Sequence, residues 1–489
     1  MKRAVAILAL MTSGCMSMEP KYVRPDPAVP ASWPVGDPYL TQSEASLPAV
    51  TYKDIFRDPR LQTLIDQALI NNRDLMVSVA NIEAARAQFQ IQRAQQFPQV
   101  GASAGVTLTG DRGSSGSGSG TGSGGSGKSS KSVTAQYSAG LSVPSFELDL
   151  FGRLRSLTHA QFERYLATEA AARATRLTLV AEIANGWLDY AADSSLLAVS
   201  QDTAATAAKS VQLTQARVNA GIAARTDLVQ AEQILDTAQA DVANQRTLVA
   251  QDVNALQLLV GAPIDPKLLS HSIDEASPTI AELPPGLSSY VLLRRPDVVE
   301  AEYNLRAANA NIGAARAALF PKITLTGLLG FASSALTSLF TGGAFGWSAS
   351  ANAAYTIFNA GAGRANVRLS QAQKEAAVAT YQGTIQSAFR DVADALARRG
   401  TMGDQLSARQ RQDAAAAEYL RLSEARYRAG VDNYLTTLDA QRSYYSARQL
   451  LVQTKLTAAQ NLVDLYQALG GDPLLQTAPV QKSPLMSNQ

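Results

Sequence analysis

Few residues in this chain of 489 are of a type that carries out chemistry. It holds one cysteine and two histidines. A single cysteine cannot form an intrachain disulfide, and so few thiol and imidazole groups leave no metal site of the usual ligand spacing. Neither histidine stands near a serine or an acid in a motif typical of nucleophilic catalysis. We therefore predict that the protein is not an enzyme, binds no metal and uses no dissociable cofactor.

Gly361-Ala-Gly363 follows a predicted strand and precedes a predicted helix, which is the setting of a nucleotide-binding loop. Asn366 stands where that motif needs its third glycine, and no acidic residue follows at the required distance. The segment is therefore interpreted as a turn between a strand and a helix.

Glu147 and Asp149 could act as a pair of carboxylates. The matching positions later in the chain hold Thr356 and Phe358 instead. A charged, water-facing strand end is the simpler interpretation of the two acidic residues.

Cys15 is a candidate for covalent lipidation. A basic start, Lys2-Arg3, precedes an apolar stretch at residues 4–11, and Ser13-Gly14 then leads to Cys15. This arrangement resembles the signal peptide and lipobox of a bacterial lipoprotein, in which residues 1–14 are removed and the cysteine is acylated. An ordinary cleaved signal with a chance cysteine is the alternative. The residue after Cys15 is not aspartate, which favours export to the outer membrane of a Gram-negative bacterium.

The overall composition excludes two further classes of protein. There are 43 basic and 41 acidic residues without a basic block, so a nucleic-acid-binding surface is not indicated. The mean hydropathy is −0.06. Beyond the N-terminus no apolar run reaches the ~20 residues of a membrane helix. A membrane role must then use strands or an anchor.

Proline placement predicts which segments are extended and which are helical. Eight of the 20 prolines lie between Pro20 and Pro59, which favours an extended arm at residues 15–60. Two long stretches, residues 145–262 and 322–472, contain no proline and can form long helices. In the first of them, apolar residues recur at intervals of seven, a pattern typical of supercoiled helices. These residues are Leu228, Leu235, Val242, Val249 and Leu256.

Four segments instead alternate apolar and polar residues with a period of two, which predicts strands with one apolar face. Each is about as long as a tilted strand that crosses a bilayer. A pair of soluble hairpins is the alternative. The segments cover residues 100–109, 133–143, 323–331 and 345–357, and aromatic residues mark their ends at Phe97, Phe146, Phe320 and Phe358.

The segment between the first two strands is nearly all glycine and serine, with 14 such residues among the 15 of positions 113–127. It cannot bury enough apolar surface to become ordered. We predict a flexible extracellular loop there, and an inter-domain linker is the alternative.

The chain is internally duplicated. Residues 81–98 align without gaps on residues 304–321 with eight identities in 18, and Ala216-Arg-Val-Asn-Ala-Gly221 matches Ala425-Arg-Tyr-Arg-Ala-Gly430 at an offset of 209. Each half then contains a helix, a β-hairpin and a long helical hairpin that bends at Gly221 or Gly430. The predicted order is first-half helices at 61–98, hairpin one at 99–148, helical hairpin at 149–262, connector at 263–295, helix at 296–320, hairpin two at 321–358, helical hairpin at 359–470 and a tail at 471–489.

Four strands cannot close a membrane barrel, because lipid leaves no strand edge unpaired and known barrels begin at about eight strands. The chain must therefore assemble with copies of itself. Two copies give eight strands and three copies give twelve.

Several motifs lie in order along nearly the whole chain, namely Tyr22-Val-Arg-Pro25, Phe56-Arg-Asp-Pro-Arg-Leu61, Leu293-Arg-Arg-Pro-Asp297, Phe320-Pro321, Tyr427-Arg-Ala-Gly430 and Leu438-Asp-Ala-Gln441. Together they resemble the TolC-like family of outer-membrane efflux proteins, in its lipoprotein branch typified by OprM. The resemblance implies an α+β membrane protein. Three chains would form a 12-stranded transmembrane β-barrel continuous with a 12-helix periplasmic α-barrel.

The resemblance also implies a function and partners. Such a trimer is the exit duct of a tripartite multidrug efflux pump, with a periplasmic adaptor and an inner-membrane transporter of the resistance-nodulation-division class. A type I secretion or metal-export duct is the alternative within the class. A lipid-anchored coiled-coil protein without a pore is the alternative outside it.

Site residues follow from the same resemblance. Leu435 and Asp439 lie four apart on one helix face and match the positions that constrict the periplasmic aperture. We expect the corresponding change at Leu228 and Glu232 on the other hairpin to matter less. The expected adaptor-docking tips hold Arg217, Gly221, Arg426 and Gly430. Arg426 and Arg428 are expected to pair with acidic residues on neighbouring helices.

Overall fold

A computed structural model describes residues 17–30, 32–34, 36, 39, 51–111, 132–281, 289–341, 343–470 and 472. The chain divides into two compact units. The strand unit comprises Met1–Val23, Ala85–Tyr165 and Asn304–Ala377, and the helix unit comprises Arg24–Ala84, Leu166–Tyr303 and Val378–Gln489. The predicted signal peptide, Cys15, the glycine- and serine-rich loop at 113–127 and residues 473–489 lie outside the described residues.

The strand unit contains one antiparallel sheet of four strands in the order β1-β2-β3-β4. The strands are β1 (Gly101–Asp111), β2 (Ser132–Leu148), β3 (Lys322–Ser333) and β4 (Phe345–Ala354). All four lie where the alternation predicted strands, although the fourth ends before Tyr355. Among the described residues of the protomer, β1 pairs only with β2 and β4 only with β3, so both outer edges of the described sheet lack a partner strand.

Strand register separates the side chains into two faces. Val106 lies opposite Tyr137, and Leu329 lies between Leu141 and Trp347, so apolar residues of all four strands share one side. This apolar face holds Ala102, Ala104, Val106, Leu108, Tyr137, Ala139, Leu141, Leu325, Leu329, Phe331, Phe345, Trp347 and Ala351. The polar face holds Ser103, Gly105, Thr107, Ser138, Gly140, Ser142, Thr324, Thr326, Ser348 and Ser350, together with Leu328. A membrane strand with lipid on one side and water on the other has this alternation.

Two glycines allow β2 and β3 to approach closely on the polar face. Gly140 lies opposite Gly330. A Cβ atom on Gly140 would lie 2.7 Å from the carbonyl oxygen of Leu329 and 2.9 Å from the Cα of Gly330. Because both obstacles are backbone atoms, no side chain can be added there without moving a strand.

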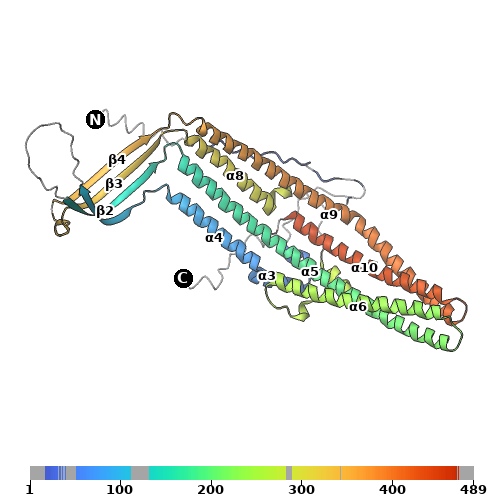
Figure 1. The fold of residues 1–489 in the computed structure, drawn as a ribbon. Helices are drawn as coiled ribbons and strands as arrows, with labels where there is room; N and C mark the ends of the chain where they lie inside the picture. Colours follow the sequence, from blue (N-terminus) through green and yellow to red (C-terminus); the bar gives the residue numbers. More distant parts are fainter. Residues whose placement is uncertain are drawn as a thin grey trace, which may run out of the picture. The chain divides into compact units, whose positions relative to one another are not determined.

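Corresponding helices of the two halves have identical lengths, as an internal duplication predicts. Each long helix, α5 (Arg153–Asn219) and α9 (Ala362–Arg428), has 67 residues, and each returning helix, α6 (Arg225–Val260) and α10 (Tyr434–Leu469), has 36. The shorter pair, α4 (Arg73–Ala94) and α8 (Pro296–Ala317), has 22 residues each. Within the helix unit, α5 and α6 run side by side as a helical hairpin (Figure 1). In the described part of the chain, no helix combines the length and the apolar character needed to cross a membrane.

Both helical hairpins turn at a glycine in the left-handed conformation. The φ angle is 73° at Gly221 and 74° at Gly430, a region that favours glycine. The amide of Ile222 donates to the carbonyl of Arg217, and the amide of Val431 donates to that of Arg426, which closes the helix end as a Schellman motif. Glycine at these positions therefore sets where each hairpin turns.

The main core of the helix unit lies where short elements pack on the long helices. These are α2 (Tyr52–Ile55), α3 (Pro59–Asn71), η1 (Pro266–Leu268), α7 (Ile273–Ala276) and η2 (Ser277–Thr279). A further 3₁₀ turn, η3 (Ser289–Arg294), precedes α8. Trp187 of α5 is fully buried at this core, and its ring nitrogen donates to the carbonyl of Leu268 at 3.0 Å. A 3₁₀ turn, η4 (Leu336–Ser338), lies between β3 and β4.

The N-terminal arm lies extended against helices. Residues 17–30 contain neither helix nor strand, as their proline content predicts, but the prediction of an extended arm up to residue 60 was wrong, because Tyr52–Ile55 form α2 and α3 begins at Pro59. In the strand unit, the ring of His159 in α5 lies 3.1 Å from the carboxylate of Glu19 and 3.1 Å from that of Glu163. Hydrogen bonds to Glu163 and Glu19 raise the pKa of His159 to about 10, so the ring is a cation between two anions at neutral pH.

A glycine lets the arm approach α8. A Cβ atom on Gly313 would lie 2.8 Å from the Cα of Glu19, so any larger residue there would displace the arm. Within the helix unit, Arg24 pairs with Glu302 at 2.8 Å, and Trp33 stacks on Phe389 of α9 at 4.8 Å. The arm is thus fastened at several separate points.

Candidate functional site: the hairpin tips

The tips of the two helical hairpins share a small apolar core. Tyr427 and Tyr434 lie with ring centroids 5.0 Å apart and pack with Ala231 and Leu438. The guanidinium of Arg217 lies over the Tyr427 ring at 4.3 Å, a cation–π contact between α5 and α9. Because the cluster draws on α5, α6, α9 and α10, it holds the two hairpins together near their turns.

Leu435 and Asp439 lie on the opposite, exposed face of α10. The side chain of Leu435 is 57% exposed, whereas its neighbours Tyr434 and Leu438 are buried. Asp439 is also exposed and accepts a long hydrogen bond of 3.4 Å from the hydroxyl of Tyr419. One turn of helix therefore presents an apolar side chain and a carboxylate on a surface that is exposed in the described part of the protomer.

Two tip arginines have local partners within the protomer. Arg426 binds Asp432 through two hydrogen bonds of 2.6 and 3.0 Å, and Arg428 binds Glu424 at 2.7 Å. Pairing with acidic residues on neighbouring helices of an assembled trimer stays a prediction. The left-handed glycine folds Asp432 back beside Arg426, and Glu424 lies one turn before Arg428 on the same helix, so local partners are nearer.

Leu228 and Glu232 are also a poor counterpart for the exposed pair. Leu228 is only 2% exposed, because it belongs to the seven-residue apolar repeat that faces other helices. The offset of 209 that relates the two halves places Thr226 and Gln230 at the positions of Leu435 and Asp439. The leucine and aspartate pair is therefore a property of the second half alone.

The remaining motifs have structural roles. Ala360 and Gly361 both have positive φ angles, 53° and 87°, in the turn between β4 and α9, as the turn interpretation predicts. Glu147 and Asp149 have separate cationic partners, Arg153 and Arg155. They do not form a carboxylate pair. Among the described residues, no group of three or more metal-binding side chains is placed to hold an ion.

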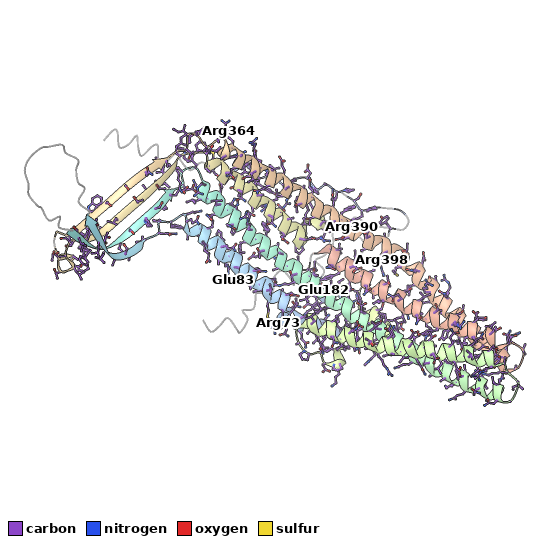
Figure 2. All side chains as sticks on the ribbon, in the orientation of Figure 1. Arg73, Glu83, Glu182, Arg364, Arg390 and Arg398 are labelled. Atoms are coloured by element: carbon purple, nitrogen blue, oxygen red, sulfur yellow. The ribbon has the colours of Figure 1, made fainter. Side chains whose placement is uncertain are left out.

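A second charged cluster lies beside the C-terminus of α10. Arg295 donates to the carbonyl of Ala468 at 2.8 Å and pairs with Asp297 at 2.8 Å, so the Arg-Arg-Pro-Asp motif caps this helix. Arg390 and Arg398 both project from α9 near it (Figure 2). In the sequence this motif contributed only to the family resemblance. Nothing in the sequence predicted that it caps the C-terminus of α10.

Three carboxylates lie together between α5, α6 and α10. Asp189 accepts from the amide of Gln460 at 2.8 Å, and Asp193 lies one turn further along α5. Burial, followed by the negative charges of Asp193 and Asp189, raises the pKa of Asp252 in α6 from 3.8 to about 7. The carboxyl group of Asp252 thus changes charge in the neutral pH range.

This raised pKa predicts a pH-dependent stability. A carboxyl whose pKa is higher in the folded state stabilises the fold below about pH 4, and that contribution is lost as the pH rises through about 7. We expect Asp252→Asn to increase the free energy of unfolding at pH 8 by about 1 kcal/mol, a value reduced for partial exposure, and to change it little at pH 4. Thermal unfolding at the two pH values measures this. Asp236→Asn, at an exposed site on the same helix, is the control, and equal gains at both pH values would contradict the prediction.

Comparison with known proteins gives a consistent result. A family model described as outer membrane efflux protein matches residues 64–262 and 287–471. The chain is 42% identical over 476 residues to the antibiotic efflux pump outer membrane protein ArpC of Pseudomonas putida, covering 97% of this chain and 96% of that one. It is equally similar, 42% with the same coverage, to the toluene efflux pump outer membrane protein TtgC of Pseudomonas putida. The open state of the Neisseria gonorrhoeae MtrE outer membrane channel superposes with a TM-score of 0.82 at 36% identity, over 93% of this chain and 98% of that one.

Proposed function

Because the chain belongs to the outer membrane efflux protein family, we propose that three copies of it form the exit duct of a tripartite multidrug efflux pump. Members of this family are efflux ducts, and the chain is one of them, in the outer membrane of a Gram-negative bacterium. The proposal adds the number of copies, the cargo class and the partners. The names of two relatives, which refer to antibiotic efflux and to toluene efflux, support antibiotics and organic solvents as cargo.

The unpaired edges of the sheet are the main observation that supports assembly of several copies of the chain. An isolated four-stranded sheet in lipid would leave the backbone groups of β1 and β4 without partners, each at a cost of several kcal/mol. Pairing β4 of one copy with β1 of the next satisfies these groups. Three copies give twelve strands, whose polar faces enclose a water-filled pore and whose apolar faces meet lipid.

The exposed leucine and aspartate support a gate at the periplasmic end. In a threefold assembly, each Asp439 would contribute to one ring of carboxylates and each Leu435 to an apolar constriction one turn away. We place the docking of the periplasmic adaptor at the hairpin turns, which hold Arg217, Gly221, Arg426 and Gly430. Opening then follows when the adaptor binds the open form more tightly than the closed one. An inner-membrane transporter of the resistance-nodulation-division class would supply the cargo.

Exposed aliphatic side chains at both turns support the same docking surface. Ile222 is 74% exposed and Val431 is 63% exposed, immediately after the two left-handed glycines. A Schellman motif usually packs this residue back on its helix. Here each side chain points into solvent instead, which leaves it available to a partner.

A lipid on Cys15 is proposed as the covalent anchor. The signal-like N-terminus supports it, and no other cysteine exists in the chain. Intact mass spectrometry of the mature protein is expected to show a diacylated or triacylated chain that begins at Cys15. A mature chain that begins elsewhere and carries no lipid would contradict the proposal.

One experiment on the purified protein and one in cells test the proposed function. In planar bilayers the protein should form ion-conducting channels, which a coiled-coil protein without a pore would not. In cells, Ile222→Glu with Val431→Glu should reduce co-purification with an adaptor and efflux of a fluorescent dye by about tenfold, since desolvating a carboxylate at an interface costs more than the ~1.4 kcal/mol that a factor of ten represents. The same variant should conduct normally in bilayers. Normal efflux by this variant would place the docking surface elsewhere.

A further inference from the structure

Three charged side chains form a cluster at the helix-side end of the sheet. Glu147 is near the end of β2, Lys322 is the first residue of β3, and Arg153 is the first residue of α5. The guanidinium of Arg153 donates to both carboxylate oxygens of Glu147 at 2.8 and 2.7 Å. The ammonium of Lys322 lies 3.0 Å from one of the same oxygens. A cavity of about 270 Å³ opens beside the cluster.

Strand register places this cluster on the polar face. Glu147 lies opposite Thr324, and Thr324 and Thr326 both belong to that face. Lys322 lies two residues before Thr324 on the same strand, and side chains two residues apart share a face. The cluster therefore lies on the side of the sheet that faces water in the proposed assembly.

The charges of the cluster do not cancel. One carboxylate serves two cations, and the neighbouring pair of Asp149 and Arg155 is neutral by itself. The side chain of Lys322 is 54% exposed, whereas that of Glu147 is 13% exposed, so the uncompensated positive charge is the one that meets solvent. The matching position in the first half of the chain is Gln99, so each copy contributes one such lysine.

We propose that Lys322, with Arg153 behind it, forms a positively charged ring on the pore wall where the sheet meets the helices, and that this ring favours small anions and anionic cargo. The inference rests on the proposed trimeric duct. Rings of like charge on a pore wall set the ion preference of a channel. This ring acts against the carboxylate ring of Asp439, so the whole channel combines two opposed preferences in series.

The test measures ion selectivity in planar bilayers with a tenfold gradient of KCl around 0.1 M. Its background is the variant Leu435→Ala with Asp439→Ala, which lacks the other charged ring. Adding Lys322→Gln should raise the ratio of potassium to chloride permeability by about twofold, because each of three copies loses one exposed cation. Glu147→Gln should lower the ratio by a similar factor, because it leaves two cations without their carboxylate. Near 1 M salt both shifts should disappear, since screening then acts within about 3 Å.

Controls separate this effect from local damage to the fold. Lys322→Arg keeps the charge and should keep the background ratio. Lys53→Gln, which removes a similarly exposed lysine outside the sheet, should do the same. Unchanged selectivity in a conducting Lys322→Gln channel would overturn the ring. Shifts in the same direction for Lys322→Gln and Glu147→Gln would also overturn it. A background variant that forms trimers but does not conduct would instead refute the duct, and the ring with it.

Discussion

Replacing Leu435 and Asp439 together by alanine is expected to raise the single-channel conductance at least about threefold and to weaken the preference for cations. In a threefold ring, carboxylates about 6 Å apart repel by about 0.7 kcal/mol per pair in water, and by several times more in a less polar setting. In the proposed gate the closed form is therefore only marginally favoured, and removing the proposed apolar constriction should move the population toward conducting states. Conductance and reversal potential of single channels measure both effects.

The matched control lies in the first half of the chain. Thr226→Ala with Gln230→Ala changes the positions equivalent to Leu435 and Asp439 but removes neither a charge nor an apolar side chain. It should leave conductance and ion preference at the wild-type values. If the double substitution in the second half also leaves them there, the aperture lies elsewhere and the role given to Leu435 and Asp439 is wrong.

Gly140→Ala should largely abolish the folded trimer. The added methyl group would lie 2.7 Å from a backbone oxygen of β3, and a Cβ atom added to Gly330 would in turn lie 2.6 Å from the backbone oxygen of Ala139. Neither strand can move aside without breaking the hydrogen bonds that pair β2 with β3. We therefore expect the overpacking to lower the free energy of unfolding by about 3 kcal/mol in each copy. The fraction of protein that migrates as a trimer on unheated denaturing gels reports this loss.

Gly105→Ala provides the comparison on the same polar face of the sheet. A Cβ atom at Gly105 would meet its nearest neighbour, the hydroxyl of Ser138, at 4.0 Å, which is ordinary contact. The substitution should be neutral or slightly stabilising, since glycine within a strand costs about 0.5–1 kcal/mol relative to alanine. Equal loss of trimer in both variants would show that the close approach at Gly140 is not the cause.

The local patterns of the sequence predicted the elements of this fold well. Period-two alternation located all four strands, and the offset of 209 between the two glycine turns predicted helical hairpins of matched length. Both signals depend only on residues close together in the chain. The glycines at 221 and 430 were informative because a left-handed backbone leaves little choice of residue.

Contacts between distant side chains were not predicted. Nothing in the sequence places His159 beside Glu19, or brings Arg153 and Lys322 to the same carboxylate. The pairing of Arg426 with Asp432 was not predicted either, because the tight turn that folds Asp432 back depends on backbone geometry rather than on charge. The seven-residue repeat already implied that Leu228 is buried. Leu228 and Glu232 were nevertheless compared with Leu435 and Asp439, because their residue types and spacing are similar.

The equal lengths of the paired helices restrict how this protein can change over time. The two halves are identical at only a minority of their positions. Even so, α5 and α9 have the same number of residues, and so do α6 and α10. A one-residue insertion in α5 would rotate everything after it by about 100° and shift it by about 1.5 Å, separating Arg217 from the Tyr427 ring. Insertions are tolerable only when they restore the helix face, as seven residues in about two turns or eleven in about three do, and when they are added to the outgoing and returning helices of both hairpins at once. Substitutions can thus accumulate in these helices, whereas lengthening them requires four coordinated insertions, one in each of α5, α6, α9 and α10.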